Sequence, residues 1–556
     1  MKLNGAGIIV ETLIEQGVDA VFGYPGGAVL HIYDELYKAA DRITHYTTCH
    51  EQGACHAADG YARASGKTGV VIATSGPGAT NLVTGIANAY LDSTPLVAIT
   101  GNVARALIGR DSFQEVDITG ITMPITKHNY IVKDVNRLAD IMREAFEIAR
   151  SGRPGPVLID VPKDIQTSQA EFTPAKPAAR PEFTQAPAIE QLERAAELIK
   201  QSQRPFIYSG GGVIIADAAP QLKAFAEAID APVGTSMMGI TVMGSENPYY
   251  LGMTGMHGKY AASLAMSKCD LLIAVGTRFS DRATGHKEEF YKGRKILHID
   301  IDPAEIGKNI PPYISLIGDV RQVLGALTAL LPPITRPSWR EEVQQIKSSP
   351  DVRLDMPRSE LNPQTVIEAV RAFAADDDVV ATDVGQHQMW TAQYYKFSRP
   401  RTLVTSGGLG TMGFGFGAAI GACIGRGKKR TVLFTSDGSF HMNMNELATA
   451  VSNELPIVIM LLNNQALGMV RQWQSLFFDK RYSNTSLERR TDYVMFAKAM
   501  GADGLRVSSL DQLAPALEKA FSAKGPVLVE AVIDHDQKVL PMIPPGGTIK
   551  DIILRG

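Results

Sequence analysis

Two polar residues in the last third of the chain each follow an apolar run, at a spacing that suits a metal site. Asp437 follows the run TVLFTS, and Asn464 follows the run PIVIMLLN, 27 positions later. That distance accommodates a strand, a crossover helix and a parallel strand, and the carboxyl ends of parallel strands meet at one edge of a sheet. Mg²⁺ accepts carboxylate and amide oxygens, and phosphate oxygens commonly complete its octahedron. The sequence therefore predicts a cation bound between two strand ends.

A helix is predicted between these strands, beginning at Gly438 and Ser439. The N–H groups of a first helical turn have no partner inside the helix and bind phosphate well. The predicted ligand is therefore a diphosphate bridged to the metal. Taken alone, the segment would also suit an ordinary buried unit of strand, helix and strand that ends in polar turn residues.

The segment resembles the cofactor motif of the thiamine-diphosphate-dependent enzymes, in which a GDG triplet is followed at a similar distance by NN. Ser436 replaces the first glycine of that triplet, so the affinity for diphosphate is the property that we expect to be most affected. The resemblance implies thiamine diphosphate and Mg²⁺ as cofactors. The resemblance assigns the metal to Asp437, Asn464 and the carbonyl of Ala466, and the diphosphate to Gly438, Ser439, Gln386 and His387. For His387, a buried structural role is the alternative.

The composition excludes several classes of protein. The chain has 556 residues and a formal net charge of −3, without a lysine-rich run, which argues against nucleic acid as a partner. The length favours about three domains over a single core. Four cysteines without metal-ligand spacing favour a reducing compartment. No apolar run is long enough to cross a membrane, and the first residues lack the pattern of a signal peptide, so we expect a cytoplasmic protein without a membrane partner.

Short apolar runs that end in glycine or another turn former alternate with helical patterns along the chain, which is typical of parallel sheets in α/β proteins. Proline-rich segments interrupt the alternation twice. We predict three doubly wound parallel-sheet domains, which the resemblance names pyrimidine-binding, central FAD-binding type and diphosphate-binding. The predicted boundaries are a first domain over 1–168, a linker over 169–189, a central domain over 190–335, a linker over 336–361 and a third domain over 362–556.

Glu51 lies at the start of a predicted helix, in the run TTCHEQGACHAADG. On its own, a helix-capping or solvent-facing carboxylate is the simpler interpretation. The resemblance gives Glu51 the catalytic role, in contact with N1′ of the coenzyme's aminopyrimidine. Because C2 of the thiazolium is a weak acid, its ionisation needs a base held in place, and a proton shared with N1′ lets the coenzyme's own 4′-amino group act as that base. An apolar pocket would favour the neutral carboxyl form.

Glu51 and the metal ligands lie in different predicted domains, so a single site requires those domains to face each other. The resemblance places the site between two subunits of a homodimer or tetramer. Met412, flanked by glycines in SGGLGTMGFGFGAA, matches the methionine that supports the bent coenzyme, and Met469 is assigned to the same cofactor site. A core methionine in a glycine-rich turn is the alternative for Met412. Phe416 and Gly417 replace the Leu-Pro of the family, which predicts a looser turn there.

Longer segments resemble the catalytic subunits of acetohydroxyacid (acetolactate) synthases, among them FGYPGGAV, CHEQGA, TSGPGATNLVTGIANAYLDSTPLVAITG, SGRPGPVLIDVPKD and GMVRQWQSLF. Glycines after a strand allow a phosphate or a ring to approach the backbone. Ser280 replaces an expected carboxylate in RFSDR, which leaves open both FAD binding and an FAD-independent catabolic enzyme. The FAD site that the resemblance implies consists of Arg153, Gly210, Gly211, Gly212, Met256, His257, Gly276, Arg278, Arg282, Asp300 and Asp319.

Two residues bear on the choice of substrate. Arg278 offers a planar fork of donors that suits a carboxylate, and by resemblance it binds the second 2-ketoacid. Trp473 would face the alkyl group of that acid and favour ethyl over methyl, a discrimination of roughly 1 to 3 kcal/mol. By resemblance, Gln114, Lys163 and the Gly27 backbone complete the pocket. Polar loop residues without a catalytic role are the alternative for the two side chains.

The resemblance implies an acetolactate synthase. Such an enzyme decarboxylates pyruvate and joins the remaining hydroxyethyl (acetyl-level) unit to pyruvate or 2-ketobutyrate, the first common step of branched-chain amino-acid biosynthesis. A pyruvate oxidase or decarboxylase on the same scaffold is the nearest alternative, and a non-catalytic homologue with broken motifs is another. Members of the family often bind a small regulatory subunit, which the sequence leaves open for this chain.

Overall fold

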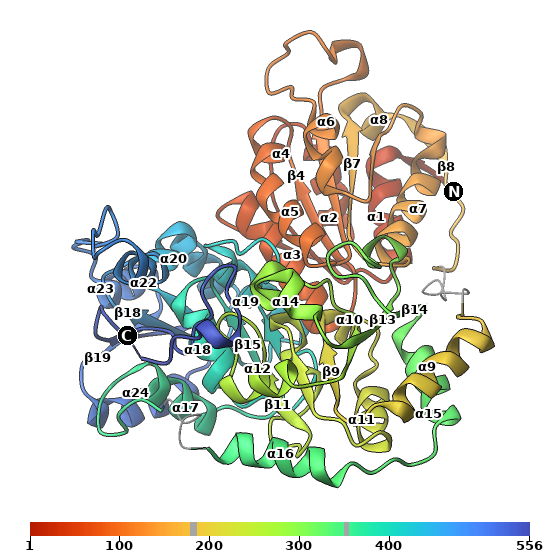
Figure 1. Ribbon diagram of the computed structural model, residues 1–556. Coiled ribbons are helices and arrows are strands. Elements are labelled where there is room, and N and C mark those ends of the chain that lie inside the picture. Colours follow the sequence, from red (N-terminus) through yellow and green to blue (C-terminus); the bar gives the residue numbers. More distant parts are fainter. Residues whose placement is uncertain (178–185, 350–354, 556) are drawn as a thin grey trace.

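The computed structural model describes residues 1–177, 186–349 and 355–555, which form three α/β domains packed against one another (Figure 1). Each domain contains one six-stranded sheet in which every pairing is parallel. The predicted fold class is thereby confirmed. In the described part of the chain, no helix combines the length and the apolar character that a membrane span requires.

The first sheet has the strand order β3-β2-β4-β5-β7-β6. Its strands are β2 (Ala20–Tyr24), β3 (Thr44–Thr47), β4 (Gly69–Ala73), β5 (Leu96–Asn102), β6 (His128–Ile131) and β7 (Pro156–Pro162). Side chains alternate along a strand, so Val70 and Ile72 of β4 face one core while Val71 and Ala73 face another. The first core is covered by α1 (Gly5–Glu15), α2 (Leu30–Lys38) and α7 (Leu138–Arg150), and the second by α3 (Glu51–Ser65), α4 (Pro77–Asn81) and α5 (Val83–Leu91).

A short antiparallel pair joins the two ends of this domain. β1 (Lys2–Asn4) pairs with β8 (Gln169–Glu171), which lies in the predicted linker 169–189. Part of that linker, residues 178–185, lies outside the described residues. The short helices α6 (Ile118–Thr122) and α8 (Lys163–Thr167) follow β5 and β7.

The central sheet has the order β11-β10-β9-β12-β13-β14. Its strands are β9 (Pro205–Ser209), β10 (Val233–Thr235), β11 (Tyr250–Met253), β12 (Leu271–Val275), β13 (Lys295–Asp300) and β14 (Ile314–Ile317). One face is covered by α9 (Ile189–Gln201), α11 (Ala219–Ala228) and α15 (Val320–Leu330), and the other by α12 (Tyr260–Ser267) and α16 (Pro337–Ser348). The remaining helices are α10 (Gly211–Ile215), α13 (Asp281–Thr284) and α14 (Lys287–Tyr291).

Helix α16 corrects the prediction of a linker over 336–361. Trp339 is buried against the central sheet, and its indole N–H donates a hydrogen bond to the carbonyl of Pro205 (2.9 Å). The first half of the segment is therefore a helix of the central domain, and residues 350–354 lie outside the described residues. Pro337 stands in the first turn of the helix, where the missing N–H has no intrahelical partner to lose.

The third sheet has the order β16-β15-β17-β18-β20-β19. Its strands are β15 (Val379–Thr382), β16 (Leu403–Val404), β17 (Thr431–Ser436), β18 (Ile457–Asn463), β19 (Asp503–Val507) and β20 (Val527–Val532). One face is covered by α17 (Pro363–Phe373), α18 (Gln386–Tyr394) and α24 (Leu513–Ser522), and the other by α19 (Phe414–Gly425), α20 (Asp437–Asn443), α21 (Leu447–Ser452) and α23 (Tyr493–Ala499). Helix α22 (Gly468–Phe477) follows β18.

Helices α3 and α19 join the first and third domains through one continuous core (Figure 1). Their contact depends on glycine. A Cβ on Gly417 would lie 2.6 Å from the carbonyl oxygen of Gly53, and a Cβ on Gly421 would overlap the carbonyl of Ala57. The two helices therefore pack backbone against backbone, which fixes the start of α3 relative to the third domain.

Candidate active site

Asp437 and Asn464 lie at the carboxyl ends of paired strands, as their spacing predicts. β17 and β18 run in parallel, with Ser436 opposite Leu462. Asp437 is buried, burial raises its pKa to about 7, and its Oδ1 has no hydrogen-bond partner among the described residues. Oδ1 of Asn464 accepts a hydrogen bond from the N–H of Ala466 (3.2 Å). The predicted ligands offer oxygen atoms only, including one unpartnered carboxylate oxygen, and so fit Mg²⁺.

Two departures from the cofactor motif are accommodated without strain. Ser436 has φ −133° and ψ 166°, an extended conformation open to any residue, so a glycine is not required there. Phe416 and Gly417 lie within helix α19, which begins directly after Gly413. Phe416 is buried and stacks on Phe440, with ring centroids 5.8 Å apart. The looser turn expected at these residues is therefore wrong, because packing against α3 and α20 holds them in a helix.

The residues predicted to hold the diphosphate surround the metal ligands. Gln386 Nε2 donates to Oε1 of Gln472 (3.1 Å), and Gln386 Oε1 accepts from Nδ2 of Asn464 (3.2 Å). His387 is buried, and burial lowers its pKa to about 3, so the ring is neutral. Its Nε2 has no partner in the part of the chain that the structure describes, and a phosphate oxygen would satisfy it. The hydroxyl of Ser439 donates to a main-chain carbonyl just after β15 (2.8 Å).

Met412 lies beside this site. Its Cε is 3.9 Å from the position that a Cβ on Gly438 would take. The N–H of Gly413 donates to Oδ1 of Asp383 (2.8 Å), a buried carboxylate at the end of β15 whose pKa burial raises to about 7. Asp383 thereby fixes the turn that carries Met412 relative to the start of α18.

The loop before Met412 is held by the first domain. Oδ1 of Asp92 accepts from the N–H of Gly408 (2.7 Å), and its Oδ2 accepts from the N–H of Gly407 (3.0 Å). Ser406 donates from Oγ to Oδ1 of Asn88 (2.6 Å). These side chains stand at the end of α5, so the first and third domains of one chain build this loop together.

A cavity of about 880 Å³ lies where the central domain meets the other two. All of the residues predicted for FAD line it, together with Met412, Met469 and Trp473. Gly210 and Gly276 follow β9 and β12, the neighbouring strands at which the order of the sheet reverses, and a Cβ on Gly210 would overlap the carbonyl of Gly276. Ligands of doubly wound sheets bind at this reversal. The size and the lining of the cavity fit a dinucleotide such as FAD.

The two arginines of the RFSDR segment both line this cavity but have different surroundings. The Arg282 guanidinium lies over the ring of Trp473, with Cζ 5.5 Å from the centroid, and its side chain is 58% exposed. Burial, and then the neighbouring positive charge of Arg153, lower the pKa of Arg278. Helix α13 begins between them, with Ser280 as its N-cap. Arg282 is therefore the arginine that contacts Trp473, whereas the sequence assigned the second 2-ketoacid to Arg278.

Three polar residues of the cavity have partners within the protein. Arg153 donates to Oε1 of Glu305 (2.7 Å) and thereby joins the first domain to the central one. Asp300 is buried at the end of β13, and burial raises its pKa to about 6. Asp319 caps α15 by accepting from the N–H of Arg321 (2.8 Å). Asp319 therefore has a structural role whether or not it also contacts a ligand.

The residues predicted for the first domain gather at the carboxyl edge of its sheet. Gly27 follows β2, Glu51 follows β3, Gln114 lies in the loop after β5, and Lys163 begins α8 after β7. Gln114 has φ +59°, and its main chain packs closely on Gly76. None of these four is among the described residues that line the cavity. Within one chain, the structure does not bring them into the cavity that contains Met412 and Trp473.

Glu51 has a partner that sequence reasoning missed. Its Oε2 accepts a hydrogen bond from Nδ2 of Asn81 (2.9 Å), at the end of α4. The sequence contains a feature that could have identified this partner, since Asn81 follows the glycine-rich turn after the strand that ends at Ala73. For Asp383 the signal was equally available, because it directly precedes the VGQH segment after a strand.

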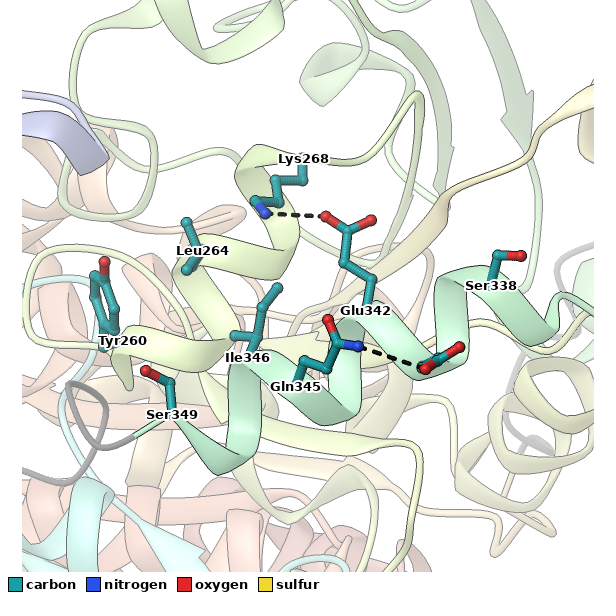
Figure 2. A pocket seen from close by; sticks show the side chains of 9 residues that line it. Tyr260, Leu264, Lys268, Ser338, Glu342, Gln345, Ile346 and Ser349 are labelled. Atoms are coloured by element: carbon teal, nitrogen blue, oxygen red, sulfur yellow. Dashed lines mark hydrogen bonds and ion pairs between the residues drawn. The ribbon is translucent and has the colours of Figure 1, made fainter.

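Figure 2 shows a second hollow, of about 640 Å³, between α12 and α16 on the central domain. Lys268 and Glu342 form an ion pair across it (2.9 Å), and apolar contacts come from Leu264 and Ile346. None of the predicted site residues lines it. The cofactor chemistry therefore belongs to the larger cavity and to the metal site beside it.

Comparison with known proteins agrees with this arrangement. The sequence matches the N-terminal TPP binding domain of thiamine pyrophosphate enzymes over residues 3–121, their central domain over 192–327 and their C-terminal TPP binding domain over 383–531. It is 45% identical over 551 residues to the acetolactate synthase isozyme 2 large subunit of Escherichia coli K12, covering 99% of both chains. It is 45% identical over 567 residues to a probable acetolactate synthase large subunit of Methanocaldococcus jannaschii, covering 99% of this chain and 95% of that one. Chloroplastic acetolactate synthase 1 of Zea mays is 44% identical over 570 residues, which cover all of this chain and 89% of the plant protein. Three thiamine-type domains in the expected order and full-length identity of this degree mean that the chain belongs to the family of thiamine-diphosphate-dependent acetolactate synthase large subunits.

Proposed function

We propose that this protein is an acetolactate synthase that uses thiamine diphosphate, Mg²⁺ and FAD. The observation that carries this choice of reaction is the pair of Arg282 and Trp473 in the cavity that also contains Met412. A cation stacked on an aromatic face supplies both a carboxylate partner and an apolar wall, which are the features needed to bind a second 2-ketoacid. An oxidase or a decarboxylase has no need of such a pair.

When bound, thiamine diphosphate would supply a carbon that becomes nucleophilic on loss of its proton, and an electron sink for the decarboxylation of pyruvate. Asp437, Asn464 and the Ala466 carbonyl would hold the metal, and Gln386, which is hydrogen-bonded to Asn464, and His387 would bind the diphosphate. Met412 would pack against the coenzyme, and the carboxyl of Glu51 would hold and release a proton at N1′ of its aminopyrimidine. Arg282 binds the carboxylate of the second acid, pyruvate or 2-ketobutyrate, while Trp473 contacts its alkyl group.

The central cavity supports retention of FAD. Replacement of the expected carboxylate by Ser280 leaves a side chain that caps α13 and accepts from the N–H of Arg282 (3.3 Å). The serine therefore stabilises the turn that presents the arginine, and the residues predicted for FAD all line the cavity, which supports the proposal.

The test is a product assay with pyruvate, thiamine diphosphate and Mg²⁺, with FAD omitted and then restored. We expect acetolactate, and higher activity with FAD. Acetaldehyde would identify a decarboxylase, peroxide or acetyl phosphate an oxidase, and full activity without FAD the catabolic variant. No turnover with any cofactor would identify a non-catalytic homologue.

We also propose that the active site forms between two subunits. Glu51 lies apart from the cavity in one chain, while the first domain exposes large apolar side chains such as Phe113 (87%) and Met123 (67%), which suit a protein interface. Phe113 lies in the loop between β5 and α6, which projects from the first domain (Figure 1). The third domain exposes Met442 and Phe478 in the same way.

Mixed dimers test this arrangement. Glu51→Gln and Asp437→Ala chains should each be inactive alone. Because a two-fold dimer pairs the first domain of one chain with the third of the other, half of the sites in a mixed dimer are intact, and random mixing should restore about a quarter of the wild-type activity. No recovery would place both residues of each site in one chain.

The bacterial and archaeal relatives are named large subunits. We therefore propose that this chain also binds a small regulatory subunit.

A further inference from the structure

The start of helix α3, which carries Glu51, is held by a carboxylate from the third domain. Oε1 of Glu446 accepts a hydrogen bond from the N–H of His50 (3.0 Å), and Oε2 accepts one from the N–H of Cys49 (3.1 Å). Thr449 donates a third hydrogen bond from Oγ1 to Oε2 (2.7 Å). Two consecutive main-chain groups next to Glu51 thus depend on a single side chain that lies almost four hundred positions away.

Glu446 is adapted to this contact. It is fully buried, at 0% exposure, and a Cβ on Gly53 would overlap its carboxylate, so the first turn of α3 approaches it as closely as only glycine permits. Burial raises the pKa of Glu446, while the N–H groups and the helix start favour the charged form. A buried carboxylate is costly unless donors satisfy it, and three donors do so here.

We propose that Glu446 is a positioning residue for the catalytic reaction: it fixes the main chain at residues 49 and 50 so that Glu51 meets N1′ of the coenzyme. Asn81 orients the carboxylate of Glu51 through its Oε2, and Glu446 holds the backbone from which that side chain extends. This inference rests on the proposed function, because it assigns a task to Glu51.

The experiment uses the Glu446→Gln holoenzyme, loaded with thiamine diphosphate, Mg²⁺ and FAD. Glutamine keeps the shape, but it leaves one oxygen for three donors and turns an N–H toward another N–H. Misplacement of a catalytic group by about 1 Å costs on the order of 10²-fold in rate. We expect exchange of the coenzyme's C2 proton for deuterium, and kcat for acetolactate, to fall together by that order, while KM for pyruvate stays within about twofold.

Two further variants make the result specific. Asp230→Asn replaces another buried carboxylate, in the central domain, which accepts from the N–H of Arg336 (2.6 Å) and from Nε of Arg340 (3.0 Å). Its exchange rate per folded molecule should match the wild type. Thr449→Val removes one donor to Glu446, and should slow exchange by about 3- to 10-fold. This variant decides the question if Glu446→Gln does not fold.

A wild-type exchange rate in Glu446→Gln, or an equal loss in Asp230→Asn, would overturn the positioning role. In either case the wild-type holoenzyme would still form acetolactate, and the proposed function would stand. If the wild-type holoenzyme neither exchanges the C2 proton nor forms acetolactate, the proposed function itself fails.

Discussion

Replacement of Arg282 by lysine tests which arginine receives the second 2-ketoacid. Lysine keeps the positive charge but loses the planar fork and the stacking on Trp473. Loss of one charge-assisted hydrogen bond costs about 1.5 to 3 kcal/mol. The stacked contact, at 5.5 Å from the ring centroid, contributes about 0.5 to 1 kcal/mol at an exposed site. A loss of about 2 kcal/mol or more corresponds to a fall of at least about 30-fold in kcat/KM for the second acid.

The assay separates the two halves of the reaction. Release of CO₂ from the first pyruvate, measured in a single turnover, should be unchanged in Arg282→Lys because that acid binds before the second one. Competition between pyruvate and 2-ketobutyrate as second acid should give slower capture of both, with less preference for 2-ketobutyrate. The second effect is expected because Trp473 loses the cation that packs on its ring.

Arg278→Lys is the matched control, since it makes the same chemical change four positions earlier. Arg278 is more buried and close to Arg153, so we expect weaker FAD binding and, at saturating FAD, an unchanged ratio of products. The reasoning is refuted if Arg278→Lys slows capture of the second acid at saturating FAD while Arg282→Lys does not. The sequence-based assignment to Arg278 would then be right.

Four other outcomes are expected. Mg²⁺ titrated without coenzyme should bind about 10-fold more weakly at pH 6 than at pH 8. Burial raises the pKa of Asp437 from 3.8 to about 7, and protons compete with the cation below that value. Equal binding at both pH values in calorimetry would contradict this, and Asp437→Asn should show no pH dependence of binding. The same raised pKa makes the metal-free protein less stable as the pH rises from about 4 to 7, because in this range the unfolded chain ionises this carboxyl while the folded form keeps it neutral. Gly421→Ala should lower the free energy of unfolding, measured by denaturant titration, by about 1 to 3 kcal/mol, because the new Cβ would overlap the main chain at Ala57. Gly325→Ala is the control and should be neutral or stabilising. It lies at an exposed helical position where no described atom lies within 4 Å of the new Cβ. Glu51→Gln should lower turnover by about 10² to 10⁴-fold with unchanged binding of FAD, and near-normal turnover would exclude its proton role.

The sequence predicted where Asp437 and Asn464 lie, because strand-end residues follow a simple rule. Apolar runs fix the strands, parallel pairing aligns their ends, and Asp437 and Asn464 then meet. Spacing alone does not decide between Arg278 and Arg282, since both follow β12 and helix α13 begins between them. The contact of Arg282 with Trp473 is what the structure adds. The linker predicted over 336–361 was wrong in its first half, because prolines suggested a linker where Pro337 begins a helix.

The position of Glu446 in the sequence does not predict its role, because it does not directly follow an apolar strand. It lies between two short helical segments in the run MNELATAV, and its partners are main-chain N–H groups, which any sequence supplies. Residues that hold the backbone of a distant segment cannot be found from local spacing. They become visible only when the close packing of α3 on α19 is known, because that packing places Glu446 at the start of α3.

At the contact between the first and third domains of one chain, each domain holds a segment of the other that carries a site residue. Glu446 of the third domain fixes the start of α3 with Glu51, while Asp92 of the first domain fixes the loop that leads to Met412. In the proposed dimer, Glu51 and Met412 of one chain belong to different active sites. Backbone packing at Gly421 allows little adjustment between them, so a displacement of this contact must act on half of each site. A substitution there should therefore lower the activity of both sites of a mixed dimer, whereas Glu51→Gln should silence only one.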